Sequence, residues 1–268
     1  MSWDRRKGLG IGCGVLVLIG ALLAGGGVWF ARQMSDDYKL VRAGEEALHE
    51  AYGLPDQWAP PNLVPAPERV EAFLTVRRDL AEWQVLLATG VVRMAALGSQ
   101  DGNPLKRFVE RLQAGSEMAS QYAGFWAARN QALLDVEMGA GEYIWLYHLA
   151  YHAWLGMDPA EGAAQPGFGS PDGQGPRDHD YQARQRLRHL VTGMLERGIP
   201  PVEEERTWRA EELGRLAADP TRYPWQTDLP LAVAEAFAAH RMALEASWSP
   251  LVNPVELLFE VEETAPGE

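Results

Sequence analysis

Residues Glu142 to Leu155 read EYIWLYHLAYHAWL, and this run decides the fold that the sequence predicts. Large apolar and aromatic side chains fall on nearly every side of a helix built from it. A helix that is apolar all round is buried, either in a protein core or in a membrane. The run is too short and too polar to span a bilayer, which needs about 20 apolar residues. The sequence therefore predicts that it forms the central helix of a folded domain.

Two long helices are predicted before this central run. Apolar residues recur every three or four positions over 67–97 and again over 104–133, which is typical of helices with one buried face. A polar turn separates the two, so they are expected to form an antiparallel hairpin. A shorter helix over 35–52 precedes them, and the connector 53–67 contains five prolines that make it stiff. Residues 35–155 thus hold the hairpin and the central helix.

The chain after the central run divides into a loop, a helical segment and a tail. Residues 156–177 are rich in Gly, Pro, Ser and Asp, and with few large apolar side chains they are predicted to form a flexible loop. Residues 178–261 contain amphipathic helices that are expected to pack on the same core. Their last part, 255–261, would form either a short strand or a packing tail. Residues 262–268 are predicted to be a frayed acidic tail.

The composition supports a folded all-α domain that does not bind nucleic acid. Apolar residues make up 47% of the chain, which argues for a packed core. The net charge of −13 disfavours binding to the phosphates of nucleic acid. The single cysteine, Cys13, lies in an apolar N-terminal run, so the helical domain must be held together by packing without a disulfide. The sequence contains no Walker A motif, no GxGxxG motif linked to a predicted strand and no GxSxG nucleophile elbow. No cofactor is predicted.

The apolar run 8–31 is predicted to cross a membrane once. Its 24 residues carry no charge, and a helix of about 20 such residues already spans the hydrocarbon core. Residues 1–7 carry three basic side chains, whereas Asp36 and Asp37 follow the run. By the positive-inside rule, residues 1–7 are cytoplasmic and the helical domain lies outside. Because the composition is rich in Arg, Ala and Gly, we expect a bacterial inner (cytoplasmic) membrane and a periplasmic domain.

A cleaved signal peptide is the competing interpretation of the same run. Secretory signals have apolar cores of about 7–15 residues, and a large side chain stands where cleavage after Ala24 would need a small one. We therefore expect a retained signal anchor. The run also contains the GxxxG pairs Gly8/Gly12 and Gly10/Gly14, whose spacing lets two membrane helices approach closely. This spacing suggests a homodimer, although it also arises by chance in a glycine-rich run.

His148 and His152 are the sharpest candidates for chemistry. Their i, i+4 spacing places both imidazoles on one helical face, as a metal site requires. The HExxH zinc motif is absent, because Leu149 follows His148. A third ligand would have to come from elsewhere in the chain. The available side chains are Glu117, Glu137, His189 and His240. The alternative, favoured by the aromatic neighbours, is a histidine pair hydrogen-bonded inside the bundle.

Glu142 is a carboxylate at the start of an otherwise aromatic helix. If buried it would have a raised pKa and could act as a general base. The simpler interpretation is that it stabilises the N-terminus of the helix or pairs with an arginine such as Arg129. Glu142 lies six residues before His148, about 240° around an ideal helix, so the two do not share a face. An aromatic ligand pocket near Trp145 and Trp154 is a further interpretation.

These patterns predict a location more firmly than a reaction. We expect a single-pass, membrane-anchored helical protein without catalytic function, acting as an envelope scaffold or protein-interaction domain. Its partners would be the lipid bilayer through residues 8–31, another envelope protein and a second copy of the chain. The alternative is a metal-dependent or acid–base enzyme centred on Glu142, His148 and His152.

Overall fold

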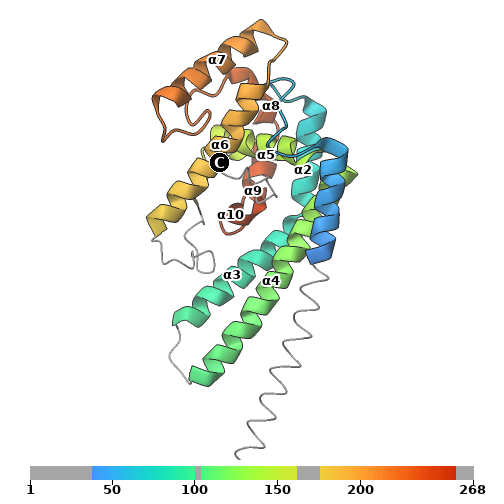
Figure 1. The fold of residues 1–268 in the computed structure, drawn as a ribbon, viewed down its shortest axis with the longest axis vertical. Coiled ribbons are helices and arrows are strands. Elements are labelled where there is room, and N and C mark those ends of the chain that lie inside the picture. The colour runs from blue at the N-terminus through green and yellow to red at the C-terminus, as the bar shows by residue number, and fades with distance from the viewer. Residues whose placement is uncertain (1–37, 100–103, 162–175, 258–268) are drawn as a thin grey trace, which may run out of the picture.

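The computed structural model describes residues 38–99, 104–161 and 176–257, which form helices joined by turns and short connectors (Figure 1). The predicted all-α bundle is confirmed for this part of the chain. The predicted membrane span 8–31 and the predicted acidic tail 262–268 lie outside the described residues. So does most of the predicted loop that follows the central helix.

The predicted hairpin is present, but its first helix is broken into α2 (Pro67–Asp79) and α3 (Ala81–Ser99). The two pieces meet at 49° around Leu80, whose side chain is fully buried. The bend lets α2 turn into the core, while α3 runs beside α4 (Pro104–Asp135) as an arm that extends from the body (Figure 1). Within the described ranges, no single helix has the length and apolar character needed to cross a bilayer, and one bent pair, α2 with α3, meets both requirements together.

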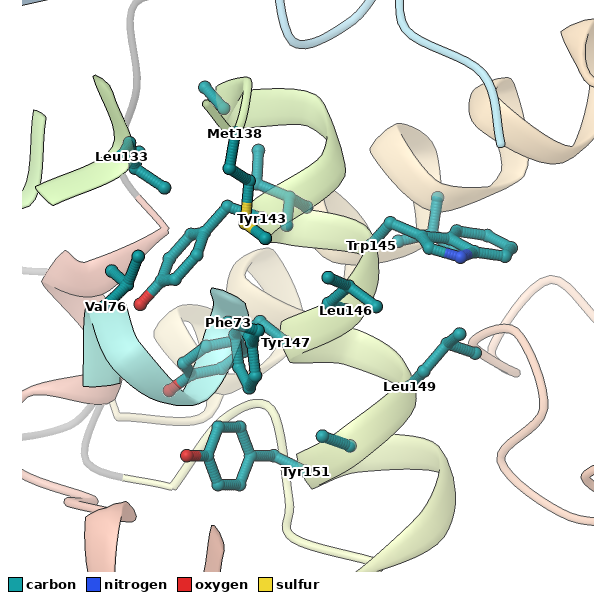
Figure 2. Packing of buried hydrophobic residues seen from close by; sticks show 14 of the residues in the cluster. Phe73, Val76, Leu133, Met138, Tyr143, Trp145, Leu146, Tyr147, Leu149 and Tyr151 are labelled. Atoms are coloured by element: carbon teal, nitrogen blue, oxygen red, sulfur yellow. The ribbon is translucent and has the colours of Figure 1, made fainter. Parts of the chain in front are cut away.

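The predicted central helix is confirmed. It comprises α5 (Ala140–Tyr147), which continues without interruption as a π-helical turn, η1 (His148–Trp154). The amide of Leu155 donates to the carbonyl of Ala150 at 3.1 Å, the five-residue spacing of a π-helix. Side chains from Tyr143 through Tyr151 point in several directions into one continuous core (Figure 2). From Tyr143 to His152 the helix is therefore buried all round, as its composition predicts.

The described C-terminal half packs around this centre and comprises α6 (Pro176–Arg197), α7 (Glu203–Ala218), α8 (Leu231–Ala238), α9 (Arg241–Ser247) and α10 (Asn253–Glu256). Ala239 and His240 form a short turn between α8 and α9. The segment 255–261 was predicted to form either a strand or a packing tail. Its described part, 255–257, lies in and just after α10. Val255 is buried there, so these residues pack as a helical turn, and the strand interpretation is wrong for them.

The N-terminal helical residues 38–52 lie along α4, and the Asn130 amide donates to the Val41 carbonyl at 3.3 Å. The proline-rich connector then reaches α7. There the amide of Leu63 donates to the buried Glu205 carboxylate at 2.7 Å, which ties the connector to α7. Segments far apart in the sequence therefore close around α5.

Candidate functional site

The most concentrated polar group in the core surrounds Arg77 of α2. Its guanidinium forms an ion pair with Glu256 of α10, and both side chains are fully buried. Nε of Arg77 donates to the Tyr151 hydroxyl at 2.9 Å, and Nη1 donates to the Tyr143 hydroxyl at 3.0 Å. Nη2 donates to the backbone carbonyl of Ser247. We call these five residues the Arg77 cluster.

Tyrosines at every fourth position of the central helix supply one wall of this cluster. Tyr143 and Tyr151 point their rings toward α2 (Figure 2). The Tyr143 hydroxyl donates to Oε1 of Glu256 at 2.7 Å, and the Tyr147 hydroxyl donates to Oδ1 of Asn253 at 3.0 Å. The guanidinium carbon of Arg77 also lies 5.3 Å and 5.1 Å from the ring centroids of Tyr147 and Tyr151. Such cation–π contacts add to the hydrogen bonds.

The charges in the Arg77 cluster stabilise one another. Burial by itself would lower the pKa of Arg77, but the oxygens of Tyr151, Tyr143 and Tyr147 outweigh burial and raise that pKa. Burial raises the pKa of Tyr147 well above its ordinary value, so this phenol stays neutral. A buried pair of this kind is costly to desolvate, and its hydrogen bonds offset that cost, although Oε2 of Glu256 has no partner within the described residues. The geometry indicates that the Arg77 cluster has a structural role and holds α2, α5, α9 and α10 together.

A second buried arginine secures the same C-terminal turn. Arg129 of α4 donates from Nη1 to the Glu256 carbonyl at 2.8 Å and lies 3.7 Å from the Glu45 carboxylate. Burial lowers the pKa of Arg129 to about 10, and Glu45 partly opposes this. Sequence reasoning did not identify the partners of Arg129 or of Arg77. A signal was present, since Arg77 follows Phe73 at helical spacing on an apolar stripe.

His148 and His152 both lie in η1 and are buried, with ring centroids 6.1 Å apart. His152 donates from Nδ1 to the Met157 carbonyl at 2.9 Å, whereas neither nitrogen of His148 makes a hydrogen bond within the described residues. Burial lowers the pKa of His148 to about 3, and the neighbouring His152 lowers it further. Burial likewise lowers the pKa of His152 to about 4. Both rings are therefore neutral at physiological pH.

The histidine pair lacks the surroundings of a complete metal site in the described part of the chain. No group of three or more His, Cys, Asp or Glu side chains there is placed to hold one ion. His148 instead packs edge-on against Tyr223 at 6.3 Å, and His152 packs edge-on against Trp248 at 5.7 Å. The metal interpretation of His148 and His152 stays a prediction. Their aromatic contacts match the alternative of a packed pair, although only His152 is hydrogen-bonded.

Glu142 forms an ion pair, but its partner is Arg69 of α2 and not Arg129. The two side chains make a two-pronged contact, with Nε to Oε1 at 2.6 Å and Nη2 to Oε2 at 2.7 Å. Both are partly exposed, and the Glu142 hydrogen bond raises the pKa of Arg69. Both carboxylate oxygens are occupied, so this geometry does not favour a general base. The neighbours of Glu142 also differ from those of the histidine pair, because Glu142 contacts Arg69 whereas the histidines contact Tyr223 and Trp248.

A small hollow of about 80 Å³ lies beside this ion pair. Trp58, Trp145, Pro61 and Pro65 line it together with Arg69 and Glu142. The volume is below the roughly 300 Å³ of sites for drug-sized ligands. Trp145 lines this hollow, whereas Trp154 stacks on Phe237 with ring centroids 6.0 Å apart. An aromatic ligand pocket near both tryptophans stays a prediction.

The surface of the hairpin arm carries the most extended run of exposed apolar residues on one described helix. Val85, Leu86 and Val92 of α3 are 67%, 46% and 59% exposed. Thr89 and Ala96 are also exposed and continue the row. We call these five residues the α3 face. Sequence reasoning assigned α3 a buried stripe, which is correct for the side that meets α4, and missed this second apolar row on the outside.

Comparisons with protein-family models, curated proteins and solved structures find no match to the chain.

Proposed function

We propose that this chain is a non-catalytic, membrane-anchored protein whose helical domain binds a protein partner in the bacterial envelope. The observation that carries the proposal is the α3 face on an arm that extends from the body (Figure 1). Clusters of exposed apolar residues on a helix are typical of interaction sites. The anchor rests on the uncharged run 8–31 and on the basic residues before it.

The contacts of the buried polar groups support a structural role for these groups in the core. The charges of the Arg77 cluster are paired and enclosed, and Glu142 is occupied by Arg69. The alternative, an enzyme centred on Glu142, His148 and His152, would need these groups to meet at a site that a substrate can enter. The two histidines are buried, and Glu142 contacts Arg69 on another side of the helix. This geometry favours the binding function.

Photo-crosslinking in the protein's own membrane tests the binding function. A photoreactive amino acid replaces Val92 in the full chain, and the control places it at Met242 of α9, which is 85% exposed. Covalent adducts with a protein should form at Val92 and not at Met242. If Val92 and Val85 both give no protein adduct, the proposed function is wrong.

Cysteine labelling tests the proposed topology separately. Cys13 is replaced by serine, and Met242 by cysteine, in the full chain. A maleimide that cannot cross the inner membrane should label the cysteine at position 242 in cells whose outer membrane alone is permeabilised. Labelling that requires lysis of the inner membrane would reverse the proposed orientation.

A further inference from the structure

We propose that the α3 face binds the same face of a second copy of this chain, so that the protein dimerises in its membrane through the hairpin arm. This inference rests on the proposed function in one respect, because it takes the α3 face to be the interaction surface. It adds the identity of the partner and the orientation of the contact.

The spacing of the α3 face suits helix pairing. Val85, Thr89, Val92 and Ala96 follow one another at intervals of four, three and four residues. Such an alternation of four-residue and three-residue intervals is the apolar spacing of helices that pack side by side. Thr89 and Ala96 are small, so a second helix can approach closely along the row.

The rest of α3 is already used by its own hairpin. Trp83 packs over Gly124, and Gly90 lies against Gln121, so the opposite side of α3 is fitted closely to α4. A two-helix arm has one interhelical seam and leaves its outer faces in water. Two such arms joined through α3 would make a four-helix bundle, in which each apolar row is covered.

The charges beside the row favour a second copy in the antiparallel orientation. Glu82 and Arg93 are both exposed, flank the row on the same side and lie 11 residues apart. In a symmetric antiparallel pair centred at the level of Ala88, Glu82 of each copy approaches Arg93 of the other, whereas a parallel pair places Glu82 of one copy and Arg93 of the other on opposite sides of the seam. Arg93 is bound to Glu117 of its own α4, and its side chain remains 55% exposed to accept a second carboxylate. Since Arg93 is the one base on α3, an anionic lipid surface fits this face less well.

The size of the face indicates that pairing depends on the anchor. A helix of 19 residues is about 28 Å long at 1.5 Å per residue. A strip of that length and about 10 Å width is well short of the roughly 800 Å² per partner in stable complexes. Confinement of both copies to one membrane raises their effective concentration and compensates for the small area. The twofold axis of an antiparallel pair is perpendicular to α3, so both predicted anchors enter the same membrane when α3 lies parallel to it.

Disulfide trapping in native membranes tests the dimer. The full chain, with Cys13 replaced by serine, carries Thr89→Cys near the proposed axis. Its matched control carries Met242→Cys, which replaces a side chain that is 85% exposed and so reports random collision. We expect a disulfide-linked dimer from Thr89→Cys and none above background from Met242→Cys. Adding Val92→Asp or Glu82→Arg to Thr89→Cys should abolish the dimer, while a thermal melt shows that each variant remains folded.

Other outcomes identify the wrong step. Equal trapping at both cysteines, or no trapping on α3, overturns the second copy as partner. If photo-crosslinking at Val92 then yields an adduct with a different protein, the binding function is supported and only the homodimer is wrong. If Val92 is modified only by a photoreactive lipid, both proposals are wrong, because the face then lies on the bilayer.

Discussion

Replacing Arg77 with methionine should destabilise the domain far more than the same change at its neighbour Arg78. Arg77 and Glu256 are fully buried and paired, so the substitution leaves the Glu256 carboxylate in the core without its cation. Tyr143 and Tyr151 also lose the donor that their hydroxyls accept from. Breaking a buried pair by removing one partner costs about 3–5 kcal/mol. Folded domains are stable by only about 5–15 kcal/mol, so this loss is large.

Two further variants separate the ion pair from the loss of an arginine as such. Arg78 lies on the same helix but is exposed, and it donates to the Thr75 hydroxyl at 2.8 Å. Arg78→Met should therefore change the free energy of unfolding by no more than about 0.5 kcal/mol. The double variant Arg77→Met with Glu256→Leu leaves neither charge buried alone. Its loss should be clearly smaller than the sum of the two single losses.

The assay is urea unfolding of the full chain in detergent, followed by tryptophan fluorescence and far-UV circular dichroism. Differences in the free energy of unfolding follow from the midpoints when the slopes agree. Two results would refute the reasoning. One is an equal loss in Arg77→Met and Arg78→Met, and the other is a double variant whose loss equals the sum of the single losses.

Three other predictions follow from the central helix. Burial lowers the pKa of His148 to about 3 and that of His152 to about 4. In the unfolded chain the histidine pKa is near 6.5, so at pH values between about 4 and 6.5 the unfolded chain binds more protons than the folded protein does. The free energy of unfolding should therefore fall as pH drops from about 6.5 to 4, and a variant with glutamine at both positions should lose this slope in urea titrations. Gly141→Ala places a Cβ 2.3 Å from that of Trp58 and should cost about 1–3 kcal/mol, whereas Gly115→Ala, with open space, should not destabilise. Elemental analysis checks the predicted metal site: bound metal should disappear in His148→Ala and His152→Ala, and a folded, metal-free parent protein contradicts the site.

Periodicity was enough to locate most helices, because burial of one face imposes a regular apolar spacing. It could not locate the break at Leu80, since both sides of that residue continue the same helical pattern. The break serves contacts with α5, α8 and α9, which are distant in sequence. The π-helical form of η1 was equally hidden, because an i, i+4 pattern such as His148/His152 does not distinguish an α-helix from a π-helix.

The sequence was enough to select candidate residues such as Glu142, but only the structure identified the residues with which they pair. Glu142 was expected to pair with an arginine, and it does so with Arg69 instead of Arg129. The Arg77–Glu256 pair joins positions 179 residues apart in the chain, and no local pattern encodes such a contact. A charged residue on an apolar stripe signals that a partner is needed, but its identity depends on which helices meet.

The sequence by itself determined that the domain is helical and that EYIWLYHLAYHAWL lies at its centre, because a run without a polar face has no stable place except the interior. Only the tertiary structure decided which apolar residues remain outside. Val85 and Val92 continue the apolar character of α3 as fully as Leu87 and Val91 do, yet the first two face water and the last two are buried. The reason is geometric, since one neighbouring helix, α4, covers a single side of α3.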